Sequence, residues 1–313
     1  MSHKFLEPIK IGNQTVKNRV MFLAMAKNIS NFDDSVSAKD IAYVESVAAG
    51  GVGLLVPGAM IVDPEWPSVL PLQPGIYDDR FIPGLRRLVL AAHKYDAKIL
   101  FQLWHPGATN YSGIDPKTVD ELTKDEIHAI QDKFVAAAKR AMAAGADGIV
   151  TGVLTPAGAL DTDALRPIYA AARQAAAKAH RTVDCTLHRA FDVCCDPFAA
   201  LEAAKQLGLA TILTSGQAAS APQGAALLGQ LVEAAGQEVE ILVGAGVSAA
   251  NIPALAAQTG ARAFHLSGKQ VLDSRMTFRR EGVPMGLPGF SEFEIWQTSE
   301  ANIRAARTAL DAL

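Results

Sequence analysis

Short apolar runs alternate with longer stretches of helical character along almost the whole chain. The runs lack the polar alternation of a strand with one wet face, which is typical of parallel strands buried on both sides. In order, they occupy residues 20–25, 52–56, 98–103, 148–154, 183–188, 211–214, 240–243 and 263–266. A helix or a helix-sized segment follows each of them. Eight such units in 313 residues favour a closed barrel over an open, doubly wound sheet.

A further pattern precedes the first run. Residues 8–16 form two short extended pieces around Gly12-Asn13, which predicts a β-hairpin. A long loop and a helix over about 299–313 close the chain. No change of composition marks an interdomain linker. The predicted fold class is therefore α/β, a single (βα)8 TIM barrel with an N-terminal β-hairpin, in one domain that covers residues 1–313.

Composition and charge narrow the classes of function. Half of the residues are hydrophobic, and the formal net charge is −3, which gives no electrostatic case for binding nucleic acid or a membrane surface. Neither a signal peptide nor an apolar run of membrane-spanning length is visible. The three cysteines, Cys185, Cys194 and Cys195, do not suggest a disulfide framework. We therefore expect a cytoplasmic protein.

Glycine-rich loops follow the last two predicted strands, at the barrel end where function gathers. Gly244 and Gly246 lie between the seventh strand and a helix, and Ser267, Gly268 and Lys269 follow the eighth. Converging backbone N–H groups with one positive charge are typical of a phosphate site at a helix N-terminus. The alternative is that the glycines only permit tight turns. We favour a phosphate-bearing small molecule as the partner.

Two other groups of residues allow more than one interpretation. The segment His188-Arg189-Ala190-Phe191-Asp192 offers an anion-binding or triad-like arrangement, or a structural Arg–Asp pair. The cysteines suggest a soft-metal site for Cu(I), or buried apolar thiols. Because Cys185 lies early in a strand and adjacent cysteines chelate one ion poorly, we favour buried thiols. We assign no metal ligands and do not expect copper.

The first half of the chain resembles the old yellow enzyme family, particularly its 2-enoate-reductase-like branch. The resemblance covers about residues 5–148 and rests on five segments, which are 6–13, 17–20, 50–54, 102–107 and 122–127. One of them reads Gln102-Leu103-Trp104-His105-Pro106-Gly107, and the five are highly specific in combination. The resemblance implies an FMN-dependent barrel that reduces activated alkenes.

The second half resembles a different family, CutC, which is linked to copper homeostasis and is also a barrel. The matching segments are 152–156, 188–192, 212–216, 244–247, 264–267 and 273–276. Both families plausibly share the Ala-Gly-x-Asp-Gly turn at 144–148, which would preserve the backbone where the two parts join. We therefore interpret the chain as an engineered chimera, in which residues 1–148 supply strands one to three and residues 149–313 supply strands four to eight.

The old yellow enzyme resemblance implies which residues would hold FMN. Ala24, Met25 and Ala26 match the strand under the flavin ring, Ala59 a second ring contact, and Gln102 the amide that bonds the pyrimidine edge. The phosphate would meet the loops after strands seven and eight. The expected cofactor-binding residues are Ala24, Met25, Ala26, Ala59, Gln102, Ser215, Gly244, Gly246, Ser267, Gly268 and Lys269.

The residues that the family uses for reduction are missing. Its substrate-anchoring His pair falls at Gly152 and Thr155, its tyrosine proton donor at Ala157, and its strand-six arginine at Thr214 to Gly216. Without donors for the developing enolate, efficient ene-reductase activity is not expected, and we assign no catalytic residue. The favoured function is residual binding of FMN or another phosphate ligand, with phosphate or sulfate as a stand-in. The alternatives are CutC-like copper handling and a scaffold without a ligand. The sequence does not predict the oligomeric state.

Overall fold

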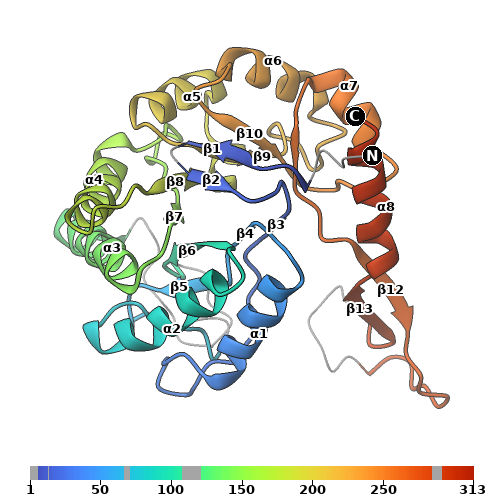
Figure 1. Cartoon of the computed structure of the whole chain (residues 1–313), viewed down its shortest axis with the longest axis horizontal. Coiled ribbons are helices and arrows are strands. Elements are labelled where there is room, and N and C mark those ends of the chain that lie inside the picture. The colour runs from blue at the N-terminus through green and yellow to red at the C-terminus, as the bar shows by residue number, and fades with distance from the viewer. Residues whose placement is uncertain (1–5, 13, 67–70, 108–120, 284–290) are drawn as a thin grey trace.

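A curled parallel sheet surrounded by helices forms the body of the protein (Figure 1). The computed structural model describes residues 6–12, 14–66, 71–107, 121–283 and 291–313. In the nine-stranded sheet the hydrogen-bonded order is β11-β10-β9-β8-β7-β6-β4-β3, and β5 also pairs with β6. Apart from β5, neighbours along this path follow sequence order, which is the arrangement of a βα barrel. The prediction of a mixed α/β fold built on a parallel, barrel-like sheet is confirmed.

All strands of this sheet except β5 fall on the predicted apolar runs. They are β3 (Met21–Phe22), β4 (Leu54–Leu55), β5 (Ala59–Ile61), β6 (Lys98–Trp104), β7 (Gly148–Thr151), β8 (Asp184–Leu187), β9 (Thr211–Thr214), β10 (Glu240–Val243) and β11 (Ala263–Phe264). Two antiparallel pairs lie outside it. They are β1 (Ile9–Ile11) with β2 (Gln14–Val16), and β12 (Lys269–Asp273) with β13 (Glu294–Thr298).

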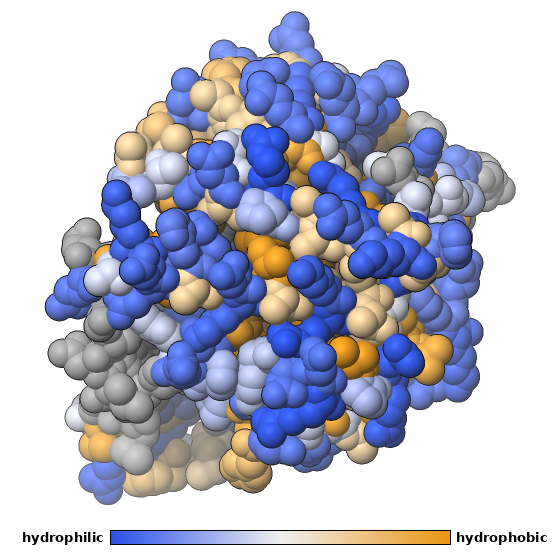
Figure 2. Space-filling model, turned by 90° about the vertical axis from the view of Figure 1, so that its left-hand side faces the viewer, coloured by the Kyte–Doolittle hydropathy of each residue, from blue (hydrophilic) through white to orange (hydrophobic). Residues whose placement is uncertain are grey.

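The helices cover the outside of the sheet. They are α1 (Ala38–Ala49), α2 (Ile82–His93), α3 (Lys124–Ala144), α4 (Thr162–Lys178), α5 (Pro197–Gln206), α6 (Ala225–Ala235), α7 (Ile252–Thr259) and α8 (Glu300–Asp311), with short 3-10 turns at Asp79–Phe81 and Arg189–Val193. Figure 2 shows that the side bearing α3 and α4 is mainly hydrophilic with scattered apolar residues, as expected for amphipathic helices. In the described ranges, no helix has the length and apolar character needed to cross a membrane.

Local sequence signals fix the helix α3 that leads to the junction of the two halves. The hydroxyl of Thr123 accepts a hydrogen bond from the N–H of Glu126, and the Glu126 carboxylate accepts one from the Thr123 N–H, which is a capping box. The helix ends at Gly145, which has φ 104°. A residue with a Cβ would be strained in this left-handed conformation. The chain therefore turns here directly into β7.

The sheet continues without interruption across the junction. β6 and β7 pair in parallel, with Leu100 opposite Gly148 and Phe101 opposite Ile149. Gly148 allows close packing, since a Cβ there would lie 2.3 Å from the carbonyl oxygen of Asp184 on β8. Phe101 and Ile149 are fully buried in the main hydrophobic core. Residues from the two halves thus share one sheet and one core.

The two halves of the chain also meet between β3 and β11, a boundary that we call the seam, and among the described residues they are not joined there by strand pairing. β3 and β11 are the two ends of the hydrogen-bonded path, and in the described part of the chain no ladder connects them. Each has only two residues, so the expected ring is not closed by strand pairing there. A second, smaller apolar cluster lies inside the sheet and includes Val16, Leu54 and Leu100.

The region after β11 differs from the predicted long loop. β12 and β13 form a five-residue antiparallel ladder in which Val271 faces Trp296, and Lys269 pairs with Thr298. Nearly all of its residues are exposed, and the pair projects from the body beside α8 (Figure 1). Because 20 residues separate the two strands, no short turn signal marks the hairpin in the sequence.

Candidate functional site

The loops after β10 and β11 enclose a cavity of about 580 Å³. It is lined by Ala245 to Ala250, by His265 to Lys269, and by Asn302 of α8. Four of the residues expected to bind phosphate, Gly246, Ser267, Gly268 and Lys269, are therefore together in one hollow. Gly244 lies beside it, because a Cβ at this position would be 3.2 Å from Nδ1 of His265.

The backbone of the loop between β10 and α7 leaves several N–H groups without a hydrogen-bond acceptor in the described structure. Ala245 and Gly246 have φ of 70° and 69°, which turns the chain sharply between β10 and α7. Asn251 fixes the end of the turn, since its Oδ1 accepts from the N–H of Ser248 at 2.8 Å and its Nδ2 donates to Gly246 O at 2.9 Å. Among the described residues, the N–H groups of Gly246, Val247 and Ala249 have no hydrogen-bond acceptor. Such a row of donors is a typical anion-binding arrangement.

The second loop contributes a positive charge. Lys269 is exposed, and its Nζ lies 3.9 Å from the centre of the Trp296 ring, a cation–π contact. Asn302 holds the loop in place, because its Nδ2 donates to the carbonyl oxygens of Lys269 at 3.0 Å and Gly268 at 3.4 Å. Asn302 and Ser248 were not among the predicted site residues. Asn302 belongs to the last helix, and nothing in the sequence spacing places that helix at this loop.

A buried carboxylate organises the ends of β8 and β9. Asp192 accepts hydrogen bonds from the hydroxyl of Thr214 at 2.5 Å, the N–H of Ser215 at 2.8 Å and Nε of Arg189 at 2.6 Å. Burial raises the pKa of Asp192, but these bonds outweigh it and lower the pKa below its ordinary value. The carboxylate is thus held ionised as a structural pair, one of the two interpretations of this segment. Ser215, which was expected to bind the cofactor, uses its N–H and hydroxyl in this network, since its Oγ donates to Ala218 O.

Two imidazoles lie at the same end of the sheet. Burial lowers the pKa of His188, and burial together with the charge of Arg189 lowers the pKa of His265. Both are therefore neutral at pH 7. His188 accepts at Nδ1 from the N–H of Ala190, while His265 lines the cavity. The sequence analysis did not single out His265, because an isolated histidine in a strand gives no spacing signal.

The ring-contact candidates of the first half lie on other strands. Ala59 of β5 is directly opposite Gln102 of β6, so these two expected contacts are neighbours. Met25 is half exposed, and its carbonyl oxygen lies beside Gly58. None of the first-half candidates lines the 580 Å³ cavity.

Small residues, namely Gly152, Thr155 and Ala157, occupy the positions at which the resemblance would place the His pair and the tyrosine. A Cβ at Gly152 would lie 3.0 Å from Cε1 of His188, so no imidazole could fit there without displacing that ring. Thr155 accepts at Oγ1 from the N–H of Ala159, and Ala157 is exposed in the intervening turn.

The cysteines do not converge. Cys185 and Cys194 are buried, Cys195 is exposed, and burial raises the pKa of Cys185 to about 12. Within the described ranges, no group of three or more His, Cys, Asp or Glu residues is placed to hold a metal ion.

Comparison with known families divides the chain in two. The sequence model of the CutC family matches residues 108–270, and that of the NADH:flavin oxidoreductase / NADH oxidase family matches residues 4–153. The overlap, 108–153, contains the predicted junction at 148. Family protein CutC of Vibrio vulnificus is 40% identical over 203 residues, which cover 65% of this chain and 78% of that protein. Its counterpart from Chromobacterium violaceum is 44% identical over 167 residues, or 53% of this chain and 64% of the relative's own length.

Solved structures support the fold. The old yellow enzyme homologue from Zymomonas mobilis superposes with a TM-score of 0.63 at 17% identity, covering 84% of this chain and 88% of its own. Morphinone reductase gives a TM-score of 0.61 at 19% identity, with 83% and 84% covered. At these identities the likeness establishes the TIM-barrel architecture. The two family matches in one chain establish its composite make-up.

Proposed function

We propose, from the premise that this chain belongs to the CutC family and carries a flavin-oxidoreductase part before it, that its composite barrel binds a phosphate-bearing small molecule. The observation that carries the proposal is the cavity between the β10–α7 and β11–β12 loops. Its free N–H groups and Lys269 offer the complement of a phosphate.

FMN is the ligand that both parts of the chain fit best. The cavity suits its phosphate, and Gln102 with Ala59 could meet the isoalloxazine ring from β6 and β5. When bound, FMN would supply hydride-transfer chemistry. The chain itself would supply binding and orientation, without efficient alkene reduction, because Gly152, Thr155 and Ala157 provide neither the imidazole pair nor the phenol that would bind and protonate the substrate.

Two further proposals concern the whole chain. Residues 1–313 form one folding domain, which the pairing of β6 with β7 and the shared core support. A reducing, cytoplasmic compartment is in keeping with three cysteines that form no disulfide.

Replacing Lys269 by alanine should weaken the binding of FMN about tenfold, since one charge-assisted phosphate contact is lost. Titration of the apoprotein with FMN, followed by flavin fluorescence, measures the change. K269R should retain most of the affinity, and K178A, which removes an exposed lysine from α4, should leave it unchanged. Absorbance at about 450 nm would indicate flavin in the purified protein, and mass spectrometry of released molecules would identify a ligand that is already bound. Equal FMN affinities of K269A and the parent protein would reject the proposed phosphate site.

A further inference from the structure

A large cavity lies at the opposite end of the sheet from the loops of the proposed phosphate site. It measures about 740 Å³ and is lined by the first residues of several strands, among them Met21, Leu54, Glu240 and Ala263. The β1–β2 hairpin forms another wall through Ile9, Ile11 and Val16. In TIM barrels this end of the sheet serves stability, and the interior is filled with side chains. An opening of this size is therefore unusual for the fold.

The unpaired seam accounts for the opening. The cavity reaches the gap between β3 and β11, where Phe264 and Leu310 also line it. β3 comes from the flavin-oxidoreductase part and β11 from the CutC part, so the side chains meeting here had different partners in their parent families. Residues that do not interdigitate leave a void, which persists because the surrounding structure relaxes only partially.

The walls and the mouth of the cavity differ in character. Ile9, Ile11, Val16, Leu54, Leu100 and Leu242 give an apolar interior. Arg19 lies two residues before β3, Arg262 directly precedes β11, and both line the cavity. Both side chains are exposed, and no hydrogen bond or ion pair engages either of them in the described structure.

One carboxylate lies between these arginines. Burial raises the pKa of Glu240, and the charges of Arg262 and Arg19 act in the opposite direction. Neither arginine is within ion-pair distance of it, so the three charges remain unneutralised by direct contact. Glu7, Lys98, Asp147 and Asp184 also line the cavity, but Lys98 lies 3.4 Å from Asp147, and Glu7 and Asp184 have partners of their own. At the seam itself, two guanidinium groups act on the single carboxylate of Glu240 at the edge of an apolar chamber.

We propose that this cavity binds a free amphipathic anion, namely an unbranched alkyl carboxylate. The alkyl chain lies against Ile11, Leu100 and Leu242, and the carboxylate lies between Arg19 and Arg262 at the open seam. The volume falls within the roughly 300–1,000 Å³ of small-molecule pockets. Burial of the chain supplies most of the affinity, at roughly 0.8 kcal/mol for each CH₂, and the arginines select the sign of the head group. This site is independent of the proposed phosphate site.

Isothermal titration calorimetry with dodecanoate, below the concentration at which it forms micelles, tests the proposal. Dodecanoate should bind saturably with one molecule per chain, and dodecyltrimethylammonium, with the same chain length, should bind at least about tenfold more weakly. Lack of saturable dodecanoate binding, or equal affinities for the two ions, would overturn the proposal.

Variants at the mouth and in the chamber separate the two contributions. The double variant R19Q/R262Q should lose about tenfold in dodecanoate affinity, whereas R87Q/R166Q, which removes two exposed arginines from helices, should lose none. E240Q should bind dodecanoate more tightly, because a like charge is removed. L242W should fill the chamber and abolish binding, and circular dichroism shows whether each variant is folded. Unchanged affinity in folded R19Q/R262Q would place the ligand elsewhere and contradict the inference.

Discussion

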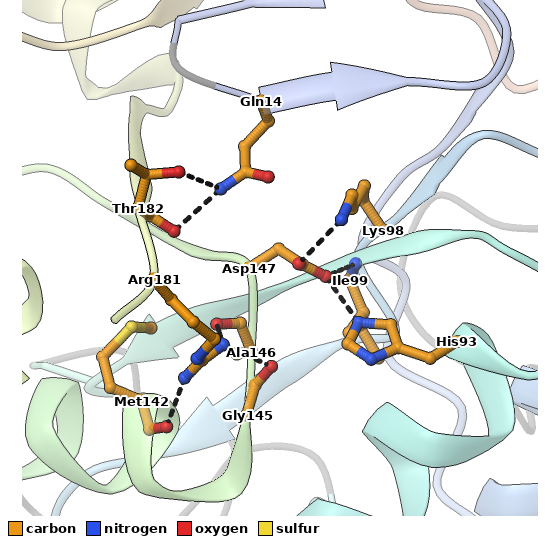
Figure 3. Close-up of polar contacts among 10 residues, drawn as sticks. All are labelled: Gln14, His93, Lys98, Ile99, Met142, Gly145, Ala146, Asp147, Arg181 and Thr182. Carbon is orange, nitrogen blue, oxygen red and sulfur yellow. Dashed lines mark hydrogen bonds and ion pairs between the residues drawn. The ribbon is translucent and has the colours of Figure 1, made fainter. Parts of the chain in front are cut away.

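Replacing Asp147 by alanine is expected to lower the free energy of unfolding by about 3 kcal/mol, because a buried carboxylate with several partners would be lost. Its Oδ2 accepts from the N–H of Ile99 at 2.9 Å and is 2.8 Å from Nε2 of His93, and its Oδ1 lies 3.4 Å from Nζ of Lys98 (Figure 3). All three partners belong to the part matched only by the flavin-oxidoreductase family. Asp147 therefore ties the start of β7 to β6.

Asp147 is also expected to make the free energy of unfolding depend on pH. Burial raises the pKa of Asp147, but the hydrogen bonds from His93 and Ile99 and the charges of His93 and Lys98 together lower it below its ordinary value. A lowered folded-state pKa means that this stabilisation is present above the unfolded-state pKa, about 4, and disappears as the pH falls through the folded-state value. Urea unfolding at pH 7 and at successively lower pH measures it. D132A, which removes an exposed carboxylate from α3, is the matched control. A loss in D147A no greater than in D132A at pH 7 would refute this role.

Replacing Arg181 by alanine is expected to cost about 2 kcal/mol, since three charge-assisted hydrogen bonds are removed. Its guanidinium donates to the carbonyl oxygens of Met142 at 2.7 Å, Gly145 at 2.9 Å and Ala146 at 3.0 Å (Figure 3). These carbonyls close α3, where a positive charge also interacts favourably with the helix dipole. Arg181 lies in the part matched only by CutC, so it holds the junction from the other side.

Replacing Arg181 by lysine separates the contribution of its charge from that of its hydrogen-bond geometry. R181K keeps the positive charge but cannot place donors on three carbonyls at once, so it should recover less than half of the loss. R166A, a change at an exposed arginine of α4, should have little effect. Thermal and urea unfolding of the three variants measure the differences. Full recovery in R181K would show that the helix dipole, rather than the fork of hydrogen bonds, is the source of stability.

Local signals were sufficient for most of the fold. Each predicted parallel strand corresponds to an apolar run, because burial on both faces imposes that pattern. The capping box at Thr123 and the turn at Gly145 can also be recognised in the sequence, since each depends on a few adjacent residues. The junction at 148 followed from family motifs on both sides of a shared turn, and it falls within the overlap of the two family matches.

Properties that depend on long-range fit could not be predicted. The sequence gives no measure of whether β3 and β11 pair, because this depends on how the ends of a curled sheet meet after six intervening units. The strands β12 and β13 are 20 residues apart, so no two-residue turn marks their pairing in the sequence. The cavity under the hairpin results from side chains of two parent families meeting at one seam, which is a question of volumes rather than of pattern.

In the candidate site, too, local signals predicted some residues, whereas others depend on long-range packing. Glycines and a lysine at strand ends predicted the phosphate loops, and the structure places Gly246, Ser267, Gly268 and Lys269 around one cavity. The contribution of Asn302 and the neutral His265 could not be foreseen, since each depends on packing between distant segments.

We propose that the parts matched by two families form one cooperative unit across β6 and β7. A direct bridge from Gln14 to Thr182, at 2.8 Å to the carbonyl oxygen and 3.1 Å to the hydroxyl, adds to the contacts of Asp147 and Arg181 (Figure 3). Native-state hydrogen exchange with mass spectrometry, in increasing concentrations of urea, is the most direct test. Peptides spanning β6 and peptides spanning β8 should then exchange through one global opening with the same free energy. Exchange of β6 at a clearly lower free energy, while β8 stays protected, would contradict the account.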